Sequence, residues 1–205
     1  MTGLSTPRVS LRQWRASDRE PFARLNADPA VMEFLSTRLD RAESDRLAQT
    51  AEAEIARQGW GLWAAELRAS AVFIGFVGLR APSFEAHFTP CIEIGWRLER
   101  ASWGKGLATE AALECLRFAF ETLDLPEVVS FTVPQNRRSR AVMERLGMLY
   151  DPDGDFDHPR LPEGNPLRRH VLYRLRQEAW RGRGLPDRDC RLPLRSARCP
   201  GGRGC

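Results

Sequence analysis

Gly104 and Gly106 are separated by a single residue and lie at the point where a segment with strand alternation meets a segment with helical periodicity. Glycine has no side chain, so the backbone can come close to a ligand at these two positions. The first turn of a helix leaves backbone N–H groups unpaired and carries the positive end of the helix dipole, which favours phosphate oxygens. These residues therefore predict a phosphate-binding site at the start of the helix.

The strand before this loop is predicted from alternation over residues 91–98. One face carries Ile92, Ile94, Trp96 and Leu98, and the other carries Cys91, Glu93, Gly95 and Arg97. After the loop, apolar residues recur at helical spacing over about 105–123, on two stripes, which predicts a helix covered on two sides. Strand, loop and helix thus form one unit around the predicted phosphate site.

The remaining elements are predicted from periodicity, caps and breakers. Asn136 is a predicted helix N-cap, and Gly59 and Gly147 are predicted helix ends. The other predicted segments are a strand at 8–14, helices at 17–27 and 41–58, a hairpin of 60–67 and 72–80, a loop at 81–89, a strand at 127–133, a helix at 136–146, a polar turn-rich stretch at 150–169 and a final strand at 170–175. This order predicts a mixed α/β sheet.

Two common phosphate motifs do not fit the glycine loop. A P-loop needs Gly-Lys followed by Ser or Thr, but Lys105 lies between the two glycines and Leu107 follows Gly106. A dinucleotide fingerprint needs a third glycine or alanine three residues after the second, where this chain has Thr109. The loop therefore belongs to neither class.

The run Trp103–Ala108 resembles the acetyl-coenzyme A loop of the GCN5-related N-acetyltransferases (GNAT), whose pattern is Gln/Arg-x-x-Gly-x-Gly/Ala at the start of the central helix. The first position of the pattern is not matched, but backbone donors do not depend on that side chain. Residues 8–18, 74–79 and 136–148, the last with Asn136 and Ser139 in an Asn-x-x-Ser pattern, resemble further GNAT elements in the right order. The resemblance covers roughly residues 8–175 and is greatest to the branch of the ribosomal-protein N-terminal acetyltransferases.

The resemblance implies an α/β (α+β) GNAT fold, with about six or seven strands in a mixed central sheet, about four flanking helices, and a sheet splayed at the acetyl-CoA site. It also implies that backbone groups of residues 96–98 bind the pantetheine arm and that the glycine loop binds pyrophosphate. The cofactor-binding residues expected in this way are Trp96, Arg97, Leu98, Trp103, Gly104, Lys105, Gly106, Leu107, Ala108, Thr109, Asn136 and Ser139.

In the family an amine attacks the thioester directly, so no nucleophilic Cys or Ser is required. Glu93 is the candidate base, acting through water; the alternative is that Glu93 pairs with an arginine or only orients the site. Many members carry a Tyr seven residues after the Asn of the fourth helix, but Met143 stands there and cannot donate a proton. Ser139 is the remaining candidate acid, as a hydrogen-bond donor to the leaving sulfur; alternatively it satisfies backbone donors at the helix start, and the thiolate leaves to solvent.

The expected activity is an acetyl-CoA-dependent N-acetyltransferase that acts on a primary amine, either a protein N-terminus or a small molecule, in a ternary complex. Because Met143 replaces the common Tyr, a non-catalytic acyl-CoA sensor is the alternative. A third hypothesis, an RNA- or ribosome-associated protein, would need a functional basic tail. The acceptor is not specified by these residues, and either a monomer or a homodimer is compatible with them.

The chain of 205 residues has a formal net charge of +4, and the segment 177–205 accounts for all of it, with seven arginines against three acidic residues. We therefore expect a neutral GNAT domain at 1–176 and a disordered Arg/Gly/Pro-rich tail at 177–205, with no nucleic-acid partner. No apolar segment suggests a leader or a membrane span, which predicts a cytoplasmic protein.

Metal binding and thiol chemistry are not expected from the cysteine and histidine spacing. Cys91 and Cys115 lie in the predicted strand and helix and are expected to be buried structural residues. The histidines are His87, His158 and His170, which are expected to have structural or surface roles, and the tail cysteines Cys190, Cys199 and Cys205 are expected to be free thiols.

Overall fold

The alternating segments pair into one eight-stranded sheet with the order β1-β2-β3-β4-β5-β6-β8-β7. The computed structural model describes residues 3–182. The strands are β1 (Leu4–Ser5), β2 (Val9–Arg12), β3 (Leu62–Leu67), β4 (Val72–Arg80), β5 (Glu93–Leu98), β6 (Glu127–Thr132), β7 (Leu149–Asp157) and β8 (Arg169–Arg176). The predicted mixed α/β fold is confirmed, with a strand count slightly above the predicted six or seven.

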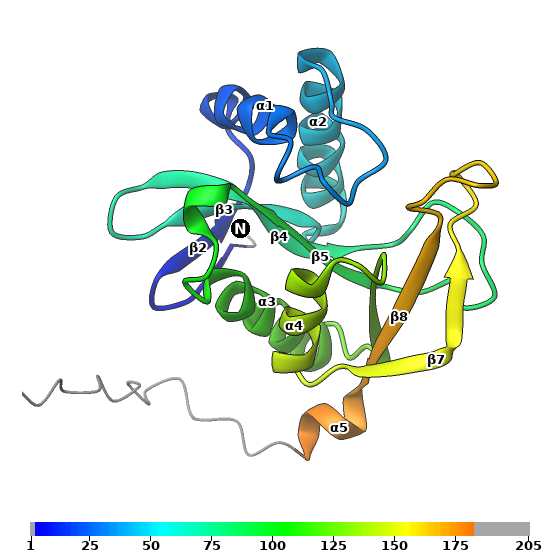
Figure 1. Ribbon diagram of the computed structural model, residues 1–205. Helices are drawn as coiled ribbons and strands as arrows, with labels where there is room; N and C mark the ends of the chain where they lie inside the picture. Colours follow the sequence, from blue (N-terminus) through cyan, green and yellow to red (C-terminus); the bar gives the residue numbers. More distant parts are fainter. Residues whose placement is uncertain (1–2, 183–205) are drawn as a thin grey trace, which may run out of the picture.

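The described part of the chain contains five α-helices, one more than predicted: α1 (Arg19–Ala27), α2 (Arg41–Gln58), α3 (Leu107–Arg117), α4 (Arg137–Arg145) and α5 (Gln177–Arg181). Short 3-10 turns occupy Ala16–Asp18 and Arg100–Ser102, and a π-helical turn, Phe118–Thr122, follows α3. Helices α1 and α2 cover one face of the sheet, and α3 and α4 cover the other (Figure 1). None of the described helices is long and apolar enough to cross a membrane.

The aromatic core forms on both faces of the sheet. On the side of α1, Phe22 packs edge-on against Trp14 and Phe76, with ring centroids 4.8 and 6.0 Å away. On the side of α3, Trp63 packs edge-on against Phe118 with centroids 5.6 Å apart. The buried sheet is therefore held between two helical layers.

The predicted helix ends are confirmed where a local cap determines them. The Asn136 side chain accepts a hydrogen bond from the backbone N–H of Ser139 at the start of α4. Gly59 and Gly147, which follow α2 and α4, have φ values of +84° and +66°. Glycine adopts this left-handed conformation without steric cost, so it ends a helix readily.

The sheet splits between β5 and β6, the only parallel pair among the described strands. Their register holds at Glu93 and Val129 alone, where the N–H of Val129 donates to the carbonyl of Ile92 at 2.9 Å. At the next residue of β6, a side chain takes the place of a backbone donor, since the Ser130 hydroxyl donates to the carbonyl of Ile94 at 3.0 Å. Beyond this point the strands diverge, as expected of a splayed sheet.

The prediction of an irregular stretch at 150–169 is wrong for its first part, because residues 149–157 form the edge strand β7. Its register with β8 shifts between Asp151 and Phe156, and Pro152 lies within the irregularity. An edge strand tolerates proline and polar residues because one side of it is not paired. Arg174 of β8 anchors the strand by donating from Nε to Asp151 at 2.6 Å.

The predicted domain boundary at residue 176 is also wrong, because residues 177–181 form α5 and belong to the folded domain. Trp180 is only 2% exposed and packs on Phe120, with ring centroids 5.4 Å apart. Gln177 adds a hydrogen bond from Nε2 to Asp124 at 2.6 Å. The rest of the predicted tail, including its three cysteines, lies outside the described residues.

The histidines at 158 and 170 come together in a second aromatic cluster under the loop before β5. Their ring centroids lie 5.2 Å apart, and Phe84 packs 4.7 Å from His158. Burial and the neighbouring His170 lower the pKa of His158 from 6.5 to about 4, and burial also lowers the pKa of His170. Both rings are therefore held in their neutral form by packing.

Loss of the α5 anchor should destabilise the whole domain. We expect Trp180→Ala to lower the free energy of unfolding by about 3–5 kcal/mol, because it leaves a cavity against Phe120. Truncation after Arg176 should have an effect at least as large. Urea unfolding checks this, with Arg181→Ala as the control, since Arg181 lies on the same helix with a side chain 68% exposed. Equal midpoints for the Trp180 and Arg181 variants would show that α5 is not part of the stable unit.

The histidine cluster predicts a loss of stability in weak acid. Because the pKa of His158 is lower in the folded than in the unfolded protein, the unfolded state binds more protons between about pH 6.5 and pH 4. The free energy of unfolding should therefore be highest above pH 6.5 and fall as the pH drops toward 4. Thermal unfolding across this range should show a flatter dependence for His158→Phe, and an unchanged slope would rule out this role of His158.

Candidate functional site

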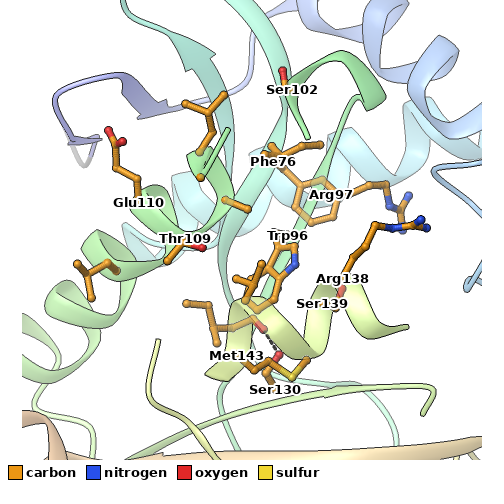
Figure 2. A pocket seen from close by; sticks show the side chains of 18 of the residues that line it. Phe76, Trp96, Arg97, Ser102, Thr109, Glu110, Ser130, Arg138, Ser139 and Met143 are labelled. Atoms are coloured by element: carbon orange, nitrogen blue, oxygen red, sulfur yellow. Dashed lines mark hydrogen bonds between the residues drawn. The ribbon is translucent and has the colours of Figure 1, made fainter. Parts of the chain in front are cut away.

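A cleft of about 1970 Å³ passes through the split in the sheet and reaches both faces. It is lined by β5, by the loop 102–110, by α4 and by residues before β2. Of the residues predicted from the sequence, the cleft brings together Glu93, Trp96, Arg97, Leu98, Trp103, Gly104, Gly106, Leu107, Ala108, Thr109, Asn136 and Ser139, whereas Lys105 does not line it. In Figure 2, Phe76 and Arg97 lie on one side of Trp96, and Met143 and Ser130 lie on the other.

The glycine loop has the geometry of an anion site. Gly104 and Gly106 have φ values of +72° and +76°, a conformation that side-chain-bearing residues rarely adopt. The N–H of Glu110 makes the first helical hydrogen bond, to the carbonyl of Gly106 at 3.0 Å. The three preceding N–H groups, of residues 107–109, lie ahead of that bond at the positive end of α3 and are available to a phosphate group.

A clamp from the N-terminal segment holds this loop, and the sequence pattern does not predict it. Arg8 donates from Nε to the Glu110 carboxylate and from Nη1 to the carbonyl of Lys105 at 2.9 Å. Thr6 donates its hydroxyl to the other oxygen of Glu110 at 2.6 Å. The clamp neutralises a carboxylate in the first turn of α3 that would otherwise oppose an anion. These partners lie 97 to 104 positions apart in the sequence, so no local pattern reveals them.

Only one of the three predicted pantetheine-binding positions, Trp96, keeps both its N–H and its C=O free in the described chain. The carbonyls of Ile92 and Ile94 face β6, as their hydrogen bonds show. By strand alternation Trp96 presents its N–H and C=O to the same gap, whereas the backbone of Arg97 is directed toward β4, where Phe76 is its register partner. The carbonyl of Leu98 is taken by the indole N–H of Trp103 at 2.8 Å.

Arg138 of α4 reaches across the rim of the cleft. Its guanidinium lies 4.5 Å from the centroid of the Trp103 ring and 5.5 Å from that of Phe34. It also pairs with Glu33 at 2.7 Å. These contacts tie α4 to the segment after α1, so Trp103 acts as a wall of the cleft through its side chain. No local sequence pattern indicates this role of Arg138, because its partners are distant in sequence.

Glu93 is buried on the α1–α2 face of β5, with a side chain 7% exposed. Its Oε2 accepts a hydrogen bond from Nε of Arg80 at 2.7 Å. Pairing with an arginine, one of the two roles considered for Glu93, is thus observed. Among the residues that the structure describes, Oε1 has no hydrogen-bond partner, so one carboxylate oxygen is available to a water in the cleft.

The start of α4 separates the two roles that were open for Ser139. Capping is done by Asn136, whose Oδ1 accepts from the Ser139 N–H at 3.2 Å while its Nδ2 donates to Thr132 at 3.0 Å. Within the described range, the Ser139 hydroxyl itself has no hydrogen-bond partner and lines the cleft. Met143, where the family's Tyr is common, is buried at 1% exposure. Ser139 is therefore the hydroxyl that α4 offers to a ligand.

The cysteines that the structure describes lie away from this chemistry. Cys91 and Cys115 are free and do not line the cleft. Burial raises the pKa of the Cys91 thiol to about 11 and raises that of Cys115 well above its usual value. Both thiols are therefore protonated and unreactive at neutral pH. Over residues 3–182, no group of three His, Cys, Asp or Glu side chains is placed to hold a metal ion.

The sequence and the fold have known relatives. The family model for the acetyltransferase (GNAT) domain matches residues 8–149. An FsC-acetyl coenzyme A-N(2)-transacetylase of Aspergillus fumigatus is 30% identical, over 86% of this chain and 77% of its own. The uncharacterised protein YkkB of Bacillus subtilis is 31% identical, over 73% of this chain and 86% of its own.

Solved structures agree with this family. An acetyltransferase from Agrobacterium tumefaciens is 31% identical with a TM-score of 0.69, covering 85% of this chain and 94% of its own. A GNAT-family acetyltransferase from Bacillus anthracis, at 22% identity, shares the fold with a TM-score of 0.70 over 86% of this chain and 99% of its own. With the split sheet and the glycine loop at the start of α3, these matches show that the chain belongs to the GNAT family of acetyltransferases, whose members use acetyl-CoA as a substrate.

Proposed function

We propose that this protein is an acetyl-CoA-dependent N-acetyltransferase that acetylates a primary amine by direct attack in a ternary complex. The observation that carries the proposal is a single cleft joining the N–H groups at the start of α3 to Glu93 through the split in the sheet. The phosphate end of the donor and the amine of the acceptor can thus enter from opposite faces. The Aspergillus relative, named as an acetyl coenzyme A-N(2)-transacetylase, supports the same chemistry.

The loop 104–109 would hold the pyrophosphate through backbone N–H groups, with the glycines allowing close approach. The backbone of Trp96, unpaired at the split, would bind the pantetheine arm like an added strand, and its N–H would polarise the thioester oxygen. Acetyl-CoA supplies an activated acetyl group, whose C–S bond breaks as the C–N bond to the amine forms. The residues named here are those that the cleft already gathers.

Glu93 would accept the proton released by the attacking amine, through a water at Oε1. Arg80, on the other oxygen, would fix the orientation of the carboxylate. Ser139 would donate a hydrogen bond from its hydroxyl to the departing thiolate, which then takes up a proton from solvent to become the free thiol. The ammonium of the acceptor must lose its proton first, so that a neutral nitrogen attacks.

A non-catalytic acyl-CoA sensor is the second candidate, because Met143 replaces the proton donor common in the family and is buried. The two functions differ in turnover and not in binding. Acetyl-CoA should raise the melting temperature in both cases, whereas release of CoA thiol over a panel of amines and peptide N-termini should appear only for the enzyme. Absence of a thermal shift would contradict both.

The glycine loop can be tested with a matched pair of glycines. A Cβ on Gly104 or on Gly164 meets no atom within 4 Å, and both residues have positive φ, +72° and +79°. Alanine should therefore cost about 1–2 kcal/mol of backbone strain at either site. Only Gly104→Ala should also weaken acetyl-CoA, by at least about tenfold in Kd, measured by isothermal titration calorimetry. Equal affinities of the two variants would contradict the phosphate role of the loop.

The catalytic roles can be separated by kinetics. We expect Glu93→Gln to lower kcat by about 10²–10⁴-fold and to remove the acidic limb of the pH–rate profile, because the amide cannot accept a proton. Ser139→Ala should lower kcat by about tenfold or more without unfolding the start of α4, since Asn136 provides the cap. Stopped assays of CoA release across pH measure both. An unchanged pH profile in Glu93→Gln would exclude Glu93 as the base.

A further inference from the structure

Arg97 is a cation in the cleft without a carboxylate partner. Its Nη1 donates to the neutral side-chain oxygen of Asn26 at 2.6 Å, and its guanidinium lies 5.4 Å from the centroid of the Phe76 ring. No ion pair within residues 3–182 involves Arg97. Arg80, on the same face of the sheet, is by contrast paired with Glu93. This part of the cleft therefore carries one uncompensated positive charge.

The surroundings of Arg97 make that charge costly to keep. Burial, together with the nearby Arg80, lowers the pKa of Arg97 to about 10, so the guanidinium is still charged at neutral pH. A partly buried charge is normally paired, because desolvation is otherwise not compensated. Asn26 is fixed by a second bond, from Nδ2 to the buried Ser44 hydroxyl at 2.8 Å. The arginine is thus held in place by neutral partners that leave its charge free.

Arg97 and Glu93 face the same side of the cleft. They lie four residues apart on β5, on the face covered by α1 and α2, so their Cα atoms are about 13 Å apart along the strand. Both line the cleft, and the face of the sheet that α1 and α2 cover lies opposite to α3 (Figure 1). Nη1 of Arg97 is engaged by Asn26, and its Nε and Nη2 have no hydrogen-bond partner in the described chain. Those two groups form the edge that binds a carboxylate with two parallel hydrogen bonds.

We infer that Arg97 binds a carboxylate of the amine acceptor, so that the substrate class is amino carboxylates, with the amine at Glu93 and the carboxylate at Arg97. This inference rests on the proposed N-acetyltransferase function and deepens it by naming the acceptor. Arg97 acts as a specificity-determining residue: it supplies the positive charge, while Asn26 and Phe76 orient its guanidinium. A free amino acid and a peptide with an acidic side chain near its N-terminus share this chemistry.

The substrate test uses pairs of amines that differ in one charge. Glycine, β-alanine, 4-aminobutanoate, 6-aminohexanoate and glutamate are compared with their carboxamides, and Glu-Ala with Gln-Ala represents the peptide source. We expect kcat/KM to be at least about tenfold higher for the carboxylate in the pair whose length matches the site. A preference for the carboxylate in the amino acid pairs indicates a free amino acid as the acceptor, and a preference for Glu-Ala over Gln-Ala indicates a peptide. Equal use of carboxylates and carboxamides throughout overturns the inference.

Two variants assign the preference to Arg97 by opposite routes. Arg97→Gln removes the charge, whereas the isosteric Asn26→Asp keeps the arginine and places a carboxylate on its Nη1. Both should abolish the preference for carboxylates, and Asn26→Asp should keep or raise the melting temperature because it completes an ion pair. The control is Arg117→Gln, since Arg117 also lines the cleft but is already paired, with Glu114 at 3.0 Å. A preference that survives in Asn26→Asp overturns the inference.

Binding separates this inference from the proposed function. Titration of glutamate into the protein saturated with CoA should give heat for the wild type and for Arg117→Gln, and none for Arg97→Gln or Asn26→Asp. Such binding without acetylation of any amine would refute the enzyme and leave the carboxylate site standing. Acetylation of amines that does not change in Arg97→Gln would support the enzyme and overturn the carboxylate site. A weakened Kd for acetyl-CoA in Arg97→Gln would assign the arginine to the donor and overturn the inference.

Discussion

The divergence of β5 from β6 after a single paired register is the constraint on which the rest of the site depends. A complete ladder between these strands would satisfy every backbone group and would close the cleft. The chain instead satisfies two of the exposed carbonyls with side chains, Ser130 on Ile94 and Trp103 on Leu98. Unpaired backbone groups are costly when they are buried. The one residue left between them, Trp96, is therefore the place where a ligand can complete the strand.

The same split gives the two substrates separate electrostatic surroundings. On the side of α3, the glycine loop and the helix start favour an anion, and the one carboxylate of that turn, Glu110, is neutralised by Arg8 and Thr6. On the side of α1 and α2, Glu93 is paired with Arg80, and Arg97 stands without an acidic partner in the described chain. Each face thus presents hydrogen-bond donors suited to a negatively charged group. Only the face covered by α1 and α2 also presents a carboxylate, that of Glu93, with an oxygen that can accept a proton.

The elements predicted correctly are those that short-range physics decides. Asn136, Gly59 and Gly147 mark helix ends because a cap or a positive φ is a property of a few consecutive residues. The errors arose where distant contacts decide. β7 contains Pro152 and several acidic residues, which suit a turn, but Arg174 of the neighbouring strand holds it as an edge strand. α5 lies in a segment of tail-like composition and forms because Trp180 finds a site against Phe120.

The sequence by itself determined the family, the glycine loop, the strand alternation that places Glu93 opposite Ile94, and the Asn-x-x-Ser start of α4, because each is a local pattern of residue types and spacing. Only the tertiary structure decided which backbone groups of β5 remain free, which hydroxyl of α4 is uncommitted, and that Arg97, unlike Arg80 on the same face, has no acidic partner in the described chain. Partners tens of residues away take up the other groups, as Arg80 does for Glu93 and Trp103 for Leu98. Which backbone groups, hydroxyls and charges remain unpaired depends on the whole fold, and these unpaired groups define the site.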